Sequence, residues 1–294
     1  MMFNIAKVLA DIEADSDQNI DLLVDLLKIK SISTIPDYAD ECYQAAGWLK
    51  AFLDSFGMDA IIYESEGHPI VFSDYQTSRP EAKTILFYGH YDVQPVDPVS
   101  LWDSDPFDPV LSSIDNEPCI IARGASDDKG QLLTFLIALK YIKNEVGELP
   151  FSLKIILEGE EECGSKTLPI FLEDYKDKLS ADIAYVCDTG MWDKDTPAIT
   201  RSLRGLLSEE FKIIGPDRDL HSGEFGGVAW NPIRIITKIL SDVYDDEGKV
   251  TIPNFYDGVN EVNENIINSW KKLTFNETEY LNKIGQKSSS GETG

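Results

Sequence analysis

Short apolar runs alternate with helical patterns over the first 190 or so residues, and this alternation limits the possible folds more than any other feature. Runs with strand character cover residues 84–88, 153–157 and 183–187. Apolar residues spaced as on one helix face mark four further segments, at residues 20–27, 45–56, 131–142 and 167–175. Strands separated by helices predict an α/β fold with a mostly parallel sheet flanked by helices.

The pattern of predicted strands and helices changes after Arg201. Residues 206–214 have strand character, and a helical pattern over residues 230–240 is introduced by Asn231-Pro232, a typical helix start. We therefore expect a domain boundary near residue 200. The first domain would cover residues 1–200, and a smaller α+β domain would cover residues 201–294.

Composition argues against several classes of partner. The chain has 52 acidic and 26 basic residues, a formal net charge of -26, which repels phosphate backbones and anionic lipids. No segment approaches the roughly 18 uninterrupted apolar residues of a membrane span, and the N-terminus lacks a signal-peptide pattern. The four cysteines form no C-x-x-C pair, which suits reduced thiols. We expect a cytoplasmic protein without nucleic-acid or membrane partners.

Polar residues with metal-binding chemistry follow the predicted strands. Ligands of open parallel sheets bind beyond the carboxyl ends of the strands. His90 and Asp92 come after the first run, two positions apart, so both side chains could face the same way on extended backbone. This spacing suits a ligand histidine oriented by a carboxylate. A purely structural histidine at a strand end is the alternative.

Three further groups of acids complete the pattern. Asp127 and Asp128 lie in a glycine-flanked turn before a helix, where acids can also serve as capping residues. Four acids lie within residues 158–162, a clustering that is unfavourable unless solvent or a cation neutralises it. Asp188 ends the next run. Because every strand end carries such a group, we expect a metal site built from imidazole and carboxylates, which suits zinc, manganese or cobalt.

Several segments resemble the aminoacylase/carnosinase-type zinc peptidases. Three carry most of the likeness: YGHYDVQP at residues 88–95, GASDDKG at residues 124–130 and EGEEECGS at residues 158–165. The likeness covers nearly the whole chain, because it extends to WDSDPF at residues 102–107, SLRG at residues 202–205 and DLHSGEFGG at residues 219–227. The same family includes carboxypeptidase G, succinyl-diaminopimelate desuccinylase and acetylornithine deacetylase.

The resemblance implies a centre with two zinc ions per subunit, with manganese or cobalt as alternatives. His90 and Asp188 would hold one ion, Glu162 would hold the other, and Asp127 would bridge them. Family members are longer than this chain and supply a final histidine ligand after the smaller domain. The only histidines here are His68, His90 and His221, so none lies at that late position. We therefore expect a C-terminally truncated chain that is inactive alone.

The resemblance also assigns catalytic roles. Asp92 would orient His90, and Glu161 would be the general base that takes a proton from the bridging water and returns it to the leaving amine. Because residues 160–162 are all glutamates, the register of this assignment matters, and it is set here by the Cys-Gly-Ser that follows.

The smaller domain of the family is a lid that mediates dimerisation. It offers a histidine to the substrate in the partner subunit's active site, and His221 matches that residue, where it would stabilise the oxyanion of the reaction intermediate. We therefore expect a homodimer. The incomplete lid would occupy residues 201–294.

The substrate expected from the resemblance is a dipeptide or short peptide, because residues 91–95, 127–130 and 220–223 look most like the dipeptidase branch. Removal of acyl groups from N-acyl amino acids, as by acetylornithine deacetylase or desuccinylase, is the alternative hydrolytic activity. A non-catalytic metal-binding module is the alternative from another class, motivated by the missing late histidine.

Overall fold

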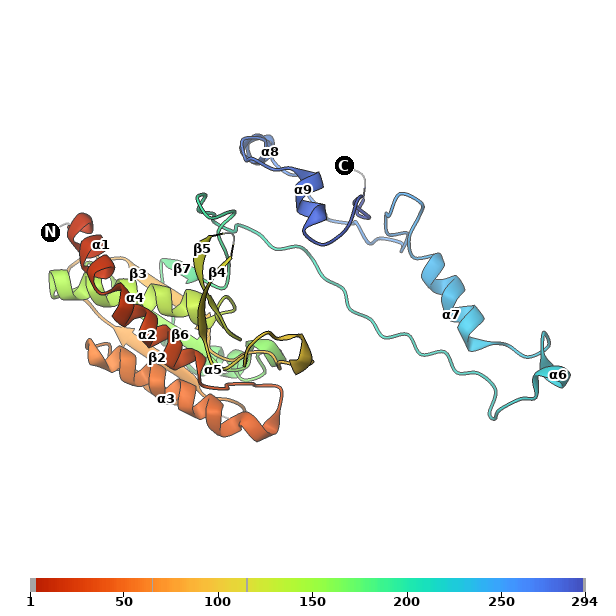
Figure 1. The fold of residues 1–294 in the computed structure, drawn as a ribbon, viewed down its shortest axis with the longest axis horizontal. Helices are drawn as coiled ribbons and strands as arrows, with labels where there is room; N and C mark the ends of the chain where they lie inside the picture. The colour runs from red at the N-terminus through yellow and green to blue at the C-terminus, as the bar shows by residue number, and fades with distance from the viewer. Residues whose placement is uncertain (1–3, 65, 115, 293–294) are drawn as a thin grey trace. The chain divides into compact units, whose positions relative to one another are not determined.

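The computed structural model describes residues 4–64, 66–114 and 116–292 (Figure 1). The chain divides into two compact units, Met1–Ser202 and Leu203–Gly294. The catalytic and lid roles expected for these two parts stay predictions.

A five-stranded sheet organises the first unit. Its order is β1-β2-β6-β3-β7, with β1 at Ile61–Tyr63, β2 at Ile70–Tyr75, β6 at Ser152–Glu158, β3 at Thr84–His90 and β7 at Ile183–Val186. β3 pairs in parallel with β6 and with β7, whereas β2 is antiparallel to β1 and β6. Only β2 therefore runs against the other strands, and the predicted α/β fold with a mostly parallel sheet is confirmed.

Helices cover both faces of this sheet. The longer ones are α1 at Ile5–Ala14, α2 at Ser16–Leu27, α3 at Ala39–Ser55, α4 at Lys129–Val146 and α5 at Leu168–Asp174. α3 and α4 pack directly on the sheet, and α1 and α2 pack on α4 (Figure 1). Short 3-10 helices lie at Pro36–Tyr38, Val99–Leu101, Glu161–Cys163 and Lys176–Lys178, and a separate hairpin pairs β4 at Val110–Ile114 with β5 at Glu117–Ile121.

Side chains that alternate between the two faces of the sheet form a hydrophobic core on each face. Val71 and Ile155 pack with α3 and α4 on one face, whereas their neighbours Phe72 and Ile156 pack with Phe171 of α5 on the other. Successive side chains of a strand point to opposite faces, so a strand covered on both sides is mostly apolar, and the polar Ser152, Lys154 and Glu158 of β6 are the exceptions here. All seven residues of β6 are buried, and those of β7, at the sheet edge, are exposed.

The second unit contains helices. They are α6 at Ser222–Phe225, α7 at Pro232–Ser241, α8 at Glu264–Trp270 and α9 at Glu277–Asn282. The predicted helix at residues 230–240 is confirmed, and the side chain of Asn231 caps it by accepting the Ile233 N–H at 2.9 Å. None of the helices in the described parts of the chain is both long and apolar enough to cross a membrane.

The predicted strand at residues 206–214 is wrong. The described residues of the second unit form no strand, so the β part of the expected α+β domain is absent there. Leu206 and Ile214 are 91% and 82% exposed. Strand character in a sequence reflects the fit to a pleated, half-buried surface. Without a partner strand to accept its hydrogen bonds, this segment stays irregular.

Gly159, directly after β6, has no space for a side chain. A Cβ there would lie 2.4 Å from the hydroxyl oxygen of Tyr91, a fully buried residue whose hydroxyl donates to the Pro69 carbonyl. We expect Gly159→Ala to lower the free energy of unfolding by about 1–3 kcal/mol, because overpacking forces a rearrangement. Chemical denaturation measures this change.

Gly47 in α3 is the matched control. A Cβ at Gly47 would meet nothing within 4 Å. Because alanine favours a helix over glycine, Gly47→Ala should raise the free energy of unfolding by about 0.5–1 kcal/mol. Destabilisation of equal size in both variants would contradict the packing argument.

Candidate metal centre

The ends of three parallel strands bring the predicted site residues to one edge of the sheet. β3 ends at His90, and this residue pairs with Glu158 at the end of the neighbouring β6. β7, on the other side of β3, ends two residues before Asp188. Parallel neighbours end at the same edge, so the residues that follow them meet there.

Three predicted ligands form a tight group. Nε2 of His90 lies 3.1 Å from Oδ1 of Asp127 and 3.8 Å from Oδ2 of Asp188, and the three donor atoms all lie within 4.8 Å of one another. The His90 side chain is fully buried, whereas those of Asp127 and Asp188 are 61% and 35% exposed. One imidazole nitrogen with two carboxylate oxygens, reachable from solvent, fits a divalent cation such as zinc.

The carboxylate of Asp92 holds the other side of the His90 ring. It is fully buried, and its Oδ1 lies 3.3 Å from Nδ1 of His90. The same carboxylate accepts the backbone N–H groups of Glu161 at 3.2 Å and of Glu162 at 3.1 Å. Metal-binding histidines commonly donate their second ring N–H to such a group. The backbone carbonyl of Asp92 lies closer to Nδ1, at 3.1 Å, so both oxygens of this residue face the same side of the ring. The carboxylate also fixes the start of the acidic run, and its role in orienting a metal ligand stays a prediction.

The three consecutive glutamates point to different partners. Glu160 is buried and accepts the backbone N–H groups of Thr167 at 2.7 Å and of His68 at 3.3 Å. Glu162 accepts the side-chain amide of Gln94 at 2.7 Å and lies outside the group of three ligands. The Glu161 carboxylate has no hydrogen bond or ion pair among the described residues. The Glu160 carboxylate is therefore occupied by backbone N–H groups, whereas the Glu161 carboxylate has no such partner among the described residues.

Gln94 was missed by the sequence analysis. The signal was present, because His90, Asp92 and Gln94 follow one another at intervals of two, the spacing that puts side chains on the same side of extended backbone. Its amide fixes Glu162 at the rim of the site.

Negative charge accumulates at this edge of the sheet. Burial and neighbouring carboxylates raise the pKa of Glu161 and of Glu162. Burial lowers the pKa of His90, but the carboxylates of Asp92 and of its neighbours raise it more, to about 10. Acids with raised pKa values around a ring that favours its charged form indicate a site short of positive charge. A bound divalent cation would supply that charge.

Asp128 gives the metal-free protein a pH dependence. Its carboxyl is fully buried, with Oδ2 accepting the His90 N–H at 3.2 Å and Oδ1 lacking a hydrogen-bond partner among the described residues. Burial raises its pKa from 3.8 to about 7. The native state therefore keeps a proton that the unfolded chain loses, so the contribution of this group to stability falls as pH rises from about 4 to 7.

We expect the melting temperature of the metal-free protein to fall between pH 5 and pH 7 in part through Asp128. The Asp128→Asn variant lacks the titrating group and should show a shallower fall over the same range. Circular dichroism melts in the presence of a chelator measure both slopes. Identical slopes would show that Asp128 does not carry the effect.

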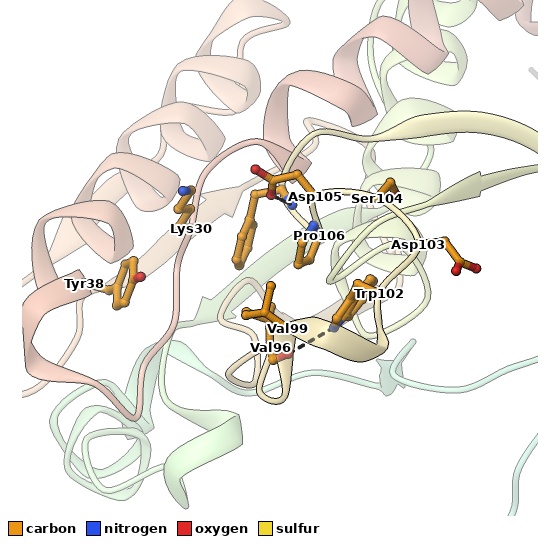
Figure 2. Close-up of a pocket in the computed structure, with 10 residues that line it drawn as sticks. Lys30, Tyr38, Val96, Val99, Trp102, Asp103, Ser104, Asp105 and Pro106 are labelled. Atoms are coloured by element: carbon orange, nitrogen blue, oxygen red, sulfur yellow. Dashed lines mark hydrogen bonds between the residues drawn. The ribbon is translucent and has the colours of Figure 1, made fainter.

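The motif at residues 102–107 forms the wall of a separate cavity. This cavity has a volume of about 500 Å³ and lies against Tyr38, Trp102 and Phe107 (Figure 2). The Trp102 indole N–H donates to the Val96 carbonyl at 3.0 Å, and the Lys30 ammonium lies 5.6 Å from the centroid of the Phe107 ring. None of the three grouped ligands lines this cavity, so it is distinct from the candidate centre.

His221 lies in the second unit. Its Nδ1 accepts the backbone N–H of Gly223 at 3.0 Å, which caps the short helix α6. Its expected role toward a substrate stays a prediction.

An α/β sheet that gathers an imidazole and carboxylates at its strand ends is the architecture of a metal-dependent hydrolase. A model of peptidase family M20/M25/M40 matches residues 86–289. The chain belongs to this peptidase family, and the resemblance found in its motifs is confirmed.

Named relatives are dipeptidases. The human Beta-Ala-His dipeptidase is 34% identical over 216 residues, which cover 73% of this chain and 42% of that protein. The Cys-Gly metallodipeptidase dug1 of Schizosaccharomyces pombe is 35% identical over 196 residues, which cover 66% of this chain and 40% of that protein. The chain thus spans about two fifths of the length of these relatives.

Two solved structures have a fold similar to that of this chain. The M20 family metallo-carboxypeptidase Sso-CP2 from Sulfolobus solfataricus matches with a TM-score of 0.74 and 31% identity, over 94% of this chain and 61% of that one. The dipeptidase Dug1p from Saccharomyces cerevisiae matches with a TM-score of 0.74 and 24% identity, over 100% of this chain and 64% of that one.

Proposed function

We propose that this chain carries the metal centre of a dipeptidase, which hydrolyses the amide bond of dipeptides or short peptides. The observation that carries the proposal is the group of His90, Asp127 and Asp188 with the ring of His90 held by Asp92. The dipeptidase relatives support the substrate class.

Two zinc ions per subunit complete the proposed centre, with manganese or cobalt as alternatives. His90, Asp127 and Asp188 already lie together, and Glu162 would join them after leaving its hydrogen bond with Gln94. When bound, the metal polarises the substrate carbonyl and makes water a stronger acid.

Glu161 is the proposed general base. Its backbone N–H is fixed by Asp92, and its carboxylate is free of partners among the described residues. Its raised pKa favours proton acceptance. Glu161 takes a proton from the water that attacks the amide carbon. As the C–N bond breaks, it passes that proton to the leaving amine.

The second unit is the proposed lid, and it would form a homodimer interface in which His221 reaches the substrate of the partner subunit. Trp230 and Ile233, at the start of α7, are exposed, as is Leu240 near its end. A helix that leaves such residues exposed suits a protein partner. Sedimentation velocity tests this part, because a monodisperse monomer would contradict it.

A cytoplasmic location is also part of the proposal. All four cysteines are free thiols, which suits a reducing compartment.

The proposal is tested by measuring zinc content and hydrolysis together. Dipeptides are compared with N-acetyl and N-succinyl amino acids, on this chain and on a longer product if the reading frame continues. We expect zinc binding and faster turnover of dipeptides. Faster turnover of the acyl compounds would favour a deacylase, zinc binding without hydrolysis would favour a non-catalytic module, and no zinc binding would overturn the centre.

A further inference from the structure

Two lysines tie the ends of α4 to the ends of two other helices. Nζ of Lys129, at the start of α4, donates to the carbonyls of Leu26 at 3.1 Å and Ile29 at 2.7 Å, at the end of α2. Nζ of Lys143, near the end of α4, donates to the two carbonyls that follow α3, those of residues 56 and 57, at 2.6 and 3.0 Å. Carbonyls at a helix end commonly accept such lysine donors. The carbonyls of Leu26 and Ile29 also accept the backbone N–H groups of Ile29 at 3.3 Å and Ser31 at 2.9 Å, so Lys129 adds a second donor to each.

Only the Lys129 end lies beside the candidate metal centre. Lys129 follows Asp127 by two residues. The chain segment that it holds after α2 also contacts the backbone beside Asp92: Oγ of Ser31 donates to the Tyr91 carbonyl at 2.7 Å, and the Val93 N–H donates to the Ser31 carbonyl at 2.9 Å. One connected set of hydrogen bonds therefore links the turn that carries Asp127 to the strand end that carries Asp92.

The methylene stem of Lys129 is closely packed against its neighbours. The Lys129 side chain is fully buried. A Cβ at Gly124, in the turn before Asp127, would lie 3.3 Å from Cδ of Lys129 and 2.9 Å from Cγ1 of Val93. Because this turn, the lysine stem and Val93 are in close contact, a displaced Lys129 would move the turn. Asp127 would then lose its place opposite His90.

We propose that Lys129 is a positioning residue of the metal centre, which fixes Asp127 relative to His90 through its two hydrogen bonds to the end of α2. This role rests on the proposed metal function. It depends on geometry, since the two bonds need two N–H donors and both the ammonium and the neutral amine provide them.

The test compares Lys129→Met with Lys143→Met. Methionine keeps a long unbranched stem and removes the donors, and both variants lose two hydrogen bonds to carbonyls at or just after the end of a helix. We expect both variants to be less stable, but only Lys129→Met to bind zinc more weakly, by about 10- to 100-fold, the usual effect of losing a group that supports a metal ligand. Isothermal titration with zinc is done at a temperature at which circular dichroism finds both variants folded.

A second readout reports the ligand arrangement itself. The visible absorption bands of the Co²⁺-loaded protein should change in Lys129→Met and stay as in the wild type in Lys143→Met. Should Lys129→Met fail to fold, Lys129→Leu removes the same two donors with an apolar side chain that suits a fully buried position, and it should also weaken zinc binding, with Lys143→Leu as its control.

The outcomes separate this role from the proposed function. Wild-type zinc affinity in Lys129→Met, or in Lys129→Leu if it must replace that variant, would overturn the positioning role and leave the metal centre standing. Equal losses of zinc affinity in Lys129→Met and Lys143→Met would show that lower overall stability causes the loss. That result would also overturn the positioning role. A wild-type chain that binds no zinc would overturn the proposed centre, and this role with it.

Discussion

The Glu161→Gln variant is expected to hydrolyse dipeptides about 10²- to 10⁴-fold more slowly than the wild type while retaining its zinc. Glutamine matches glutamate in size but cannot accept a proton from the attacking water. The backbone N–H of residue 161 would still donate to Asp92, so the local structure should persist. Steady-state kinetics with a dipeptide, on the form of the protein that is active, measure kcat, and elemental analysis measures the zinc content.

Glu160→Gln is the control for the register of the acidic run. Glu160 precedes Glu161 directly, but its carboxylate accepts the backbone N–H groups of Thr167 and His68. The amide of glutamine can accept with only one oxygen, so this variant should lose about 1–3 kcal/mol of stability. Its kcat should fall far less than that of Glu161→Gln. A larger loss of kcat at position 160 would show that the general base is assigned one residue too late.

The Asp92→Asn variant is expected to bind zinc about 10- to 100-fold more weakly than the wild type. The carboxylate of Asp92 serves the His90 ring and two backbone N–H groups at once, at distances of 3.1 to 3.3 Å. An asparagine would direct an NH₂ group at one of these donors, which would release the acidic run or leave the ring held only by the backbone carbonyl of residue 92, at 3.1 Å. Titration with zinc measures the loss of affinity.

Glu158→Gln is the matched control for Asp92→Asn. Glu158 is also a fully buried carboxylate at the end of a central strand, but it accepts the hydroxyl of Ser165 at 3.0 Å and that of Tyr88. Among the described residues, the Glu158 side chain forms no hydrogen bond or ion pair with the His90 ring. The zinc affinity should therefore change less than in Asp92→Asn. Equal losses would attribute the effect to the removal of charge.

The central strands were predictable because burial on both faces leaves a nearly continuous apolar run, interrupted in β6 by Lys154. The expected runs at residues 84–88 and 153–157 lie within β3 and β6, and each strand extends beyond its run by one or two residues. β1 has only three residues, and β2 continues into the polar Ser73 and Asp74, so neither has a run of comparable length. Residues 206–214 have the residue types of a strand but lack a partner, which no local pattern reveals.

The meeting of the site residues was also predictable, because it follows from strand order. His90, Asp127 and Asp188 come together because their strands or turns end at one edge of the sheet. The directions of Glu160 and Glu162 were not predictable, since they depend on a 3-10 turn and on partners as distant in sequence as His68 and Gln94. The catalytic roles carried over from the resemblance stay predictions.

Exposure of the edge strand β7 has a consequence for how firmly Asp188 is held. Asp188 follows β7, whose residues are exposed, whereas His90 follows β3, which lies between two strands. Strands with few buried contacts open most readily, so the amide hydrogens of residues 183–186 should exchange with solvent faster than those of β3. Of the three residues that would hold a cation, Asp188 is therefore the one whose backbone is expected to be least firmly held. A cation held by His90, Asp127 and Asp188 would tie the end of β7 to the end of β3, so its binding should slow the exchange of β7 most.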